Sequence, residues 1–170
     1  MKVIFLDVDG VLNSNFWVED NQKEISEDTF IEQDKVELLS QIVRETGASI
    51  VMHSGWRFWF DENLKPKRKE AKQFLTILQS HELSIFSVTP DFSTEDIRKT
   101  KKFSLVKAKE ILAWIQMHQE IEKWLVIDDL DLNNGEVERH QLKTDSTIGL
   151  TEENVEFAIK MLKGVDAYEI

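Results

Sequence analysis

The chain alternates short apolar runs with longer segments in which apolar residues recur every three or four positions. A short apolar run rich in Val and Ile that ends at a turn-forming residue predicts a buried β-strand. Four runs fit this description, and a weaker fifth lies near residues 147–148. The four predicted strands are residues 3–6, 48–53, 84–88 and 124–127.

The segments with helical spacing predict four amphipathic helices, at residues 34–45, 66–80, 104–118 and 152–163. Gly47 follows the first of them, where a C-terminal cap is expected. Pro66 is expected in the first turn of the second helix, and Ser104 is expected to cap the third. Thr151 and Gly164 are expected to cap the two ends of the last helix.

Two stretches between these elements lack periodicity. Residues 13–32 are polar and acidic, so we expect a loop or flap there, with a short ordered piece around residues 16–18. Residues 90–102 are expected to form a surface loop. The remaining alternation of strands and helices predicts an α/β fold, a Rossmann-like three-layer domain with a mostly parallel sheet. Because no linker divides the chain, we expect a single domain spanning residues 1–170.

Composition narrows the class of protein. With 41% hydrophobic residues, a chain of 170 residues can build a core, so intrinsic disorder is not expected. The absence of cysteine excludes disulfides, a thiolate metal site and a Cys nucleophile. The sequence lacks a long apolar run of the kind that forms a signal peptide or crosses a bilayer. We therefore expect a cytoplasmic protein without a membrane partner.

The net charge of −11 hides an uneven distribution. Residues 57–109 carry 12 basic and 7 acidic side chains, so positive charge is concentrated in the middle of the chain. Most of it lies in two runs, at residues 65–69 and 98–102. These runs are either solvated surface or a region that meets an anionic substrate, and the sequence leaves both interpretations open.

Oxygen-bearing side chains follow three of the predicted strands. In an open parallel sheet the ligand lies beyond the carboxyl ends of the strands, so these side chains are expected to converge. Carboxylates packed so closely repel each other unless a cation compensates, and oxygen ligands without His or Cys favour Mg²⁺. The convergent groups are the carboxylates of Asp7 and Asp9 after the first strand, the hydroxyl of Ser54 after the second and the carboxylates of Asp128 and Asp129 after the fourth. Lys107, near the start of a helix, is expected to join them.

The run from Val3 to Asn13, with its Asp-x-Asp-Gly-Val core, resembles the first motif of the haloacid dehalogenase (HAD) superfamily. Ser54 resembles the second-motif hydroxyl residue, Lys107 the third-motif basic residue, and Asp128 with its neighbour the fourth-motif acidic pair. The combination is most similar to the small HAD domains found in Swiss Army Knife RNA repair proteins. This resemblance spans nearly the whole chain and implies a HAD-like domain with a minimal cap.

The resemblance implies a Mg²⁺-dependent phosphate monoester hydrolase. Asp7 is expected to attack phosphorus, and Asp9 to act as general acid and then general base. Val8 lies between them and is expected to turn into the core. The implied metal site comprises Asp7, the backbone carbonyl of Asp9, and Asp128 and Asp129, with the direct ligand of the last two left open. The implied substrate-binding residues are Ser54, Gly55, Arg57 and Lys107.

Several positions keep two interpretations. Arg57 is either a phosphate clamp or an ion-pair partner, and His53 is expected to be a core histidine that points away from Ser54. Asp131 either supports the metal site or lies in a surface turn. The aromatic group of Trp56, Phe58, Trp59 and Phe60 either packs in the core or under a lid, or stacks on a nucleobase. Lys102 and Lys109 are alternatives to Lys107.

Other functions are less consistent with these residues. Asp9 argues against dehalogenation, because HAD members that act on carbon–chlorine bonds lack this carboxylate. A receiver domain would carry its acidic pair after the first strand, whereas the pair here follows the fourth. A catalytically silent binding or regulatory module remains the alternative, although it would be expected to lack Asp7 or Asp9. The expected partner is a phosphorylated substrate, with a nucleotide or a nucleic-acid end as candidates.

Overall fold

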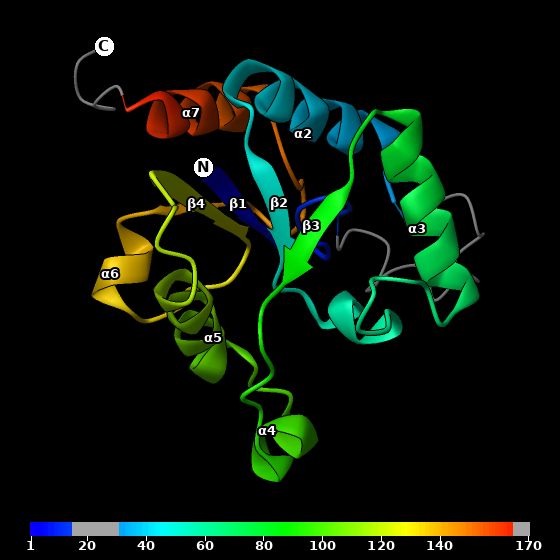
Figure 1. Ribbon diagram of the computed structural model, residues 1–170, viewed down its shortest axis with the longest axis vertical. Coiled ribbons are helices and arrows are strands. Elements are labelled where there is room, and N and C mark those ends of the chain that lie inside the picture. The colour runs from blue at the N-terminus through cyan, green and yellow to red at the C-terminus, as the bar shows by residue number, and fades with distance from the viewer. Residues whose placement is uncertain (15–30, 165–170) are drawn as a thin grey trace.

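The computed structural model describes residues 1–14 and 31–164 and shows a five-stranded parallel sheet in the order β3-β2-β1-β4-β5 (Figure 1). Each neighbouring pair of strands is parallel. This confirms the α/β fold with a parallel sheet and places β1 at its centre. The strands are β1 (Lys2–Leu6), β2 (Ser49–Met52), β3 (Ile85–Val88), β4 (Lys123–Asp128) and β5 (Gln141–Lys143).

Helices cover both faces of the sheet and give the three layers. In Figure 1, α2 (Gln33–Thr46) and α7 (Glu152–Lys163) lie above the sheet, and α3 (Lys69–Ser80) continues this layer to the right. The opposite face carries α5 (Ser104–Gln116) and α6 (Gly135–Glu138). The short helix α4 (Glu95–Thr100) and the 3₁₀ helix η1 (Gly55–Trp59) follow β3 and β2 respectively.

The alternation of side chains along β1 explains the two halves of the core. Ile4 and Leu6 pack with residues of α2, α3 and α7, whereas Val3 and Phe5 pack with residues of α5 and α6. All four side chains are buried, because a central strand of a parallel sheet is covered on both faces. Each such apolar side chain contributes about 1.5–3 kcal/mol on burial. The apolar run that predicted this strand is therefore a consequence of its central position.

The structure confirms the caps predicted at Gly47, Thr151 and Gly164. Gly47 and Gly164 both adopt the left-handed conformation at the ends of their helices. The Thr151 side chain accepts a hydrogen bond from the backbone N–H of Asn154 in a capping box. These signals are local, so the sequence alone places them correctly.

One predicted helix start and one predicted helix cap are wrong. Helix α3 begins at Lys69, and Pro66 instead forms an isolated antiparallel bridge with Phe60. The Lys67 N–H donates to the Trp59 carbonyl, which holds this segment in a turn ahead of the helix. Ser104 is the first residue of α5 and does not cap it, and no side chain caps this helix start.

Short elements escaped the sequence analysis. Helix α4 lies within the predicted loop 90–102, where Thr94 caps it and only Ile97 is buried, so its apolar pattern is too brief to detect. The fifth strand is β5, which buries only Leu142, and not residues 147–148. Those residues lie in a tight turn, in which the Ile148 N–H donates to the Asp145 carbonyl. Helix α6 was not predicted.

Most of the predicted loop 13–32, including its ordered piece around residues 16–18, lies outside the described residues. In the part of the chain that the structure describes, no helix combines the length and apolarity needed to cross a bilayer.

Candidate active site

The chain leaves β1 in a turn that separates Val8 from its two acidic neighbours. The Asp7 N–H donates to the Ile127 carbonyl, which extends the pairing of β1 with β4 by one residue. Val8 is fully buried, as the strand alternation predicted, and Gly10 turns the chain with φ of 80°. Asp7 is buried, whereas Asp9 is exposed. The two carboxylates therefore differ sharply in their access to solvent.

A pocket of about 450 Å³ lies beyond the carboxyl ends of the strands, where the topology predicted it. Its lining contains every predicted site residue except Asp128, which lies fully buried beneath it. The predicted residues in the lining are Asp7, Asp9, Ser54, Gly55, Arg57, Lys107 and Asp129. Residues that follow β1, β2 and β4, together with Lys107 of α5, therefore converge on one cavity.

Lys107 joins two of the acidic residues. It lies in the first turns of α5, and its Nζ is 2.8 Å from Asp128 Oδ2 and 3.6 Å from Asp7 Oδ1. Burial opposes the charge of Lys107, but the carboxylates of Asp7 and Asp128 raise its pKa above the usual value. A buried positive charge thus stands beside Asp7. Lys102 and Lys109, the alternatives in the sequence, are exposed and do not line the pocket.

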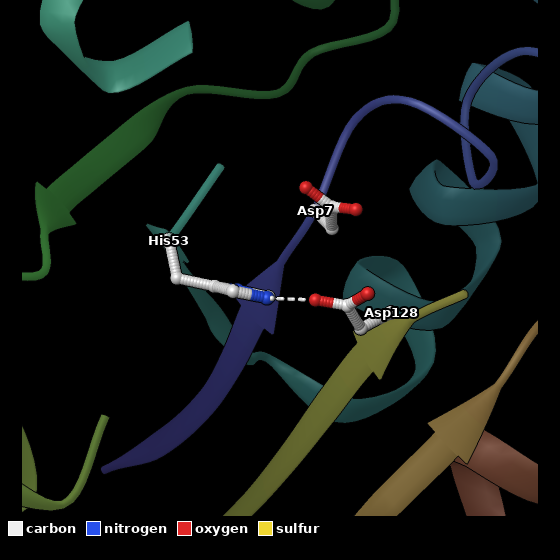
Figure 2. Close-up of side chains that lie close together, drawn as sticks. All are labelled: Asp7, His53 and Asp128. Carbon is white, nitrogen blue, oxygen red and sulfur yellow. Dashed lines mark hydrogen bonds and ion pairs between the residues drawn. The ribbon is translucent and has the colours of Figure 1, made fainter. Parts of the chain in front are cut away.

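His53 completes a buried network that the sequence analysis did not assign to the site. Its Nε2–H donates to Asp128 Oδ2 over 2.7 Å. Figure 2 marks this hydrogen bond with a dashed line. Burial alone would raise the pKa of Asp128, but the hydrogen bond from His53 and the charge of Lys107 hold it well below its usual range. His53 is a buried histidine, as predicted. The alternation of side chains along its strand was the signal that could have indicated a contact with the buried Asp128.

Asp7, His53 and Asp128 offer three ligand atoms within 4.8 Å of one another, close enough to hold a metal ion (Figure 2). Asp128 Oδ2, however, already accepts hydrogen bonds from both His53 and Lys107. An ion bound through Asp128 Oδ2 would compete with Lys107 for this oxygen. This group is one possible cation site, and Asp7 also belongs to a second one, next to Asp129.

Asp129 lies against the turn that follows β1. A Cβ atom on Gly10 would lie 2.5 Å from Asp129 Oδ2, so only glycine lets this carboxylate approach. Burial and the repulsion of Asp128 raise the pKa of Asp129 to about 6. Burial likewise raises the pKa of Asp7 to about 7, against the attraction of Lys107. Two carboxylates that resist ionisation side by side form the second possible cation site.

Ser54 and Arg57 shape the wall of the pocket next to Asp7. Ser54 caps η1 by accepting a hydrogen bond from the Trp56 N–H, so it fills the role of a turn cap and also lines the pocket. Arg57 forms a buried ion pair with Glu110 at 3.0 Å and donates to the Ser54 carbonyl. These contacts favour the ion-pair interpretation of Arg57 over a direct phosphate clamp. The arginine holds the loop that carries Ser54.

The aromatic group divides between core and pocket. Trp56 and Phe60 are buried, which confirms core packing for these two side chains. Phe58 is 43% exposed and lines the pocket, with the Arg57 guanidinium over its ring. Trp56 also lines the pocket, so the pocket wall carries the exposed ring of Phe58 and the buried ring of Trp56. Asp131 is exposed and pairs with Lys143, so it lies in a surface turn.

The two basic runs occupy different positions. Lys65, Lys67, Arg68 and Lys69 are exposed, and none of them lines the pocket. Lys101, from the second run, does line it. An anionic ligand in the pocket would therefore meet the run at residues 98–102 before the run at residues 65–69.

A central strand followed by Asp-x-Asp-Gly, a serine and a lysine on one pocket, and an acidic pair of which Asp129 lines the pocket and Asp128 binds the lysine together define a domain of the HAD class. The family model described as the HAD domain in Swiss Army Knife RNA repair proteins matches residues 3–155, and the chain belongs to this family. Neither the curated proteins nor the solved structures contain a match to the chain.

Proposed function

We propose that the protein hydrolyses phosphate monoesters with Mg²⁺, through an aspartyl-phosphate intermediate. One observation carries this proposal: Asp7 and Asp9 line a single pocket together with Ser54 and Lys107. The pocket thus combines a nucleophile, a separate acid/base carboxylate and groups that can bind phosphate oxygens. Membership of the HAD family supports the same chemistry.

The residues of the pocket fit a magnesium ion. Asp7 and Asp129 supply carboxylate oxygens, and the backbone carbonyl of Asp9 is a third ligand of the kind that Mg²⁺ prefers. The raised pKa values of Asp7, about 7, and Asp129, about 6, reflect burial and crowding that a divalent cation would relieve. When bound, the ion would neutralise negative charge between the nucleophile and the phosphate.

In the first half of the reaction, an oxygen of the Asp7 carboxylate attacks phosphorus as the bond between phosphorus and the leaving oxygen breaks. Asp9 gives its proton to that oxygen, so the product alcohol leaves neutral. Lys107, held charged beside Asp7, and the Ser54 hydroxyl bind the other phosphate oxygens as their charge redistributes.

In the second half, Asp9 removes a proton from water, and the water oxygen attacks phosphorus. The bond between phosphorus and Asp7 breaks, and inorganic phosphate leaves. Asp9 then carries the proton needed for the next cycle. Its exposure at the open side of the pocket suits a group that exchanges protons with both the alcohol and water.

A nucleotide or a nucleic-acid end is the substrate class that we propose. The family description places related domains in RNA repair proteins. In this chain Lys101 and the exposed ring of Phe58 line the same pocket as Asp7, so a phosphate next to a base would meet a cation and an aromatic ring.

A panel of phosphate esters, including oligonucleotides with 3′- or 5′-phosphates, tests the proposal. We expect phosphate release with Mg²⁺, loss of activity in EDTA, and recovery when Mg²⁺ is added back. The terminally phosphorylated oligonucleotides should give the highest kcat/KM. Release of no phosphate from any ester, with the folded protein and Mg²⁺ present, would contradict a hydrolase and favour a silent module.

Magnesium should stabilise the protein more at higher pH. Because burial raises the pKa of Asp7 to about 7 and that of Asp129 to about 6, both above the unfolded value of 3.8, the folded metal-free protein binds protons more tightly than the unfolded chain. Below pH 3.8 these two groups therefore contribute their full stabilisation to the folded protein, and this contribution is lost as the pH rises toward 7.

A bound cation replaces those protons, so the increase in Tm on adding Mg²⁺ should be larger at pH 8 than at pH 5.5. Thermal melts at both pH values, with and without Mg²⁺, measure this. A Tm increase that is equal at the two pH values, or larger at pH 5.5, would show that Mg²⁺ does not bind to these carboxylates.

A further inference from the structure

Asp9 requires external support to point at a leaving group. It is exposed and lies directly before the Gly10 turn, so its own backbone leaves the carboxylate free to rotate. The structure supplies a donor to each oxygen: the Trp56 indole Nε1–H donates to Oδ2 over 3.1 Å, and the Asn13 side chain donates to Oδ1 over 3.0 Å. The two bonds fix the plane of an otherwise exposed carboxylate.

Trp56 is itself held firmly. Its side chain is buried, and its backbone N–H donates to Ser54 Oγ at the start of η1. The centroid of the Trp59 ring lies 4.6 Å from that of the Trp56 indole. The centroid of the Phe74 ring lies 5.2 Å from it, in an edge contact. A ring confined by two aromatic neighbours offers its N–H in one direction only. The firmly packed indole thus holds the Asp9 carboxylate in one position.

Asn13 acts from the other side and belongs to the same turn as Asp9. Its side-chain oxygen accepts a hydrogen bond from the Gly10 N–H, and the side chain is buried. This contact ties Asn13 to the turn itself, whereas Trp56 connects Asp9 to the segment after β2. Through its indole N–H, Trp56 therefore couples the Asp9 carboxylate to the loop that carries Ser54.

We propose that Trp56 is a positioning residue that holds Asp9 in place for proton transfer to the leaving oxygen. This inference rests on the proposed phosphatase function. Each carboxylate oxygen has two lone pairs, so one hydrogen bond from Trp56 leaves the second lone pair of Oδ2 free to carry the transferred proton. Through the indole, the position of the Ser54 loop also sets the position of Asp9.

Trp56→Phe removes the N–H and keeps an aromatic ring between Trp59 and Phe74. The two test substrates are phenyl phosphate and p-nitrophenyl phosphate, which are similar in size but differ in how much their leaving oxygen needs a proton. We expect kcat/KM to fall about tenfold or more for phenyl phosphate and less than about twofold for p-nitrophenyl phosphate. The parameter kcat/KM is chosen because it reports the steps up to departure of the alcohol.

Trp124→Phe is the matched control. It makes the same change in the core on the other face of the sheet, where the Trp124 ring contacts Phe5 and His140 and does not line the pocket, so the ratio of the two kcat/KM values should stay at its wild-type value. An equal fall on both substrates in Trp56→Phe, or no fall on phenyl phosphate, would overturn the positioning role.

A second measurement tests the contact without using activity. In a ¹H–¹⁵N spectrum the Trp56 indole signal, assigned by its absence in Trp56→Phe, should shift in Asp9→Ala because its hydrogen-bond acceptor is gone. The Trp59 indole signal should move much less. If the Trp56 signal does not move, the contact is absent and the positioning role is wrong, whatever the outcome of the phosphatase assays.

Discussion

Asp7→Asn is expected to lower phosphate ester turnover by at least about a thousandfold while the protein stays folded. The amide keeps the size of the carboxylate but does not attack phosphorus, so neither half-reaction proceeds. The fold should persist because Lys107 keeps its shorter bond to Asp128, at 2.8 Å. Phosphate release under saturating Mg²⁺ and a circular dichroism spectrum measure the two effects.

Asp131→Asn is the matched control for this change. Asp131 is an exposed carboxylate that pairs with Lys143 away from the pocket, so its amide variant should retain wild-type turnover. Turnover near the wild-type rate in Asp7→Asn would exclude the aspartyl-phosphate mechanism.

Asp128→Ala is expected to lower the free energy of unfolding by about 3–5 kcal/mol, because it leaves buried polar partners without their acceptor. Asp128 accepts from both His53 and Lys107, and all three side chains are buried. Urea unfolding monitored by tryptophan fluorescence measures this change.

Asp129→Ala should lower the affinity for Mg²⁺ and leave the stability of the metal-free protein almost unchanged. Removing Asp129 relieves its repulsion with Asp128, so the metal-free protein should lose little stability, whereas Mg²⁺ affinity measured by calorimetry should fall at least about tenfold. The pair of variants distinguishes the two possible cation sites. If Asp129→Ala bound Mg²⁺ normally and Asp128→Ala stayed stable but did not bind it, the ion would belong to the Asp7, His53 and Asp128 group.

Much of the pocket lining could be predicted because its residues directly follow the apolar runs that form the strands. Asp7 and Asp9 follow an apolar strand, Ser54 follows another, and a parallel sheet brings the carboxyl ends of its strands to one edge. Lys107 was expected near this edge from its position at the start of a helix, and the resemblance to the HAD superfamily favoured it over Lys102 and Lys109. The sequence therefore determined the fold class, the main strands and helices, and the edge of the sheet where the pocket lies.

The tertiary structure decided which side chains meet. Arg57 pairs with Glu110 across 53 residues of sequence, and Trp56 donates to Asp9 across 47. Asp128 is buried against His53 and Lys107, whereas its neighbour Asp129 lines the pocket. This difference also arises from the packing of α5 against the strands. Periodicity along the chain records which face of an element is apolar, but it does not record which polar group on a distant element lies opposite. Those partners depend on how helices pack against the sheet, so only the folded chain determines them.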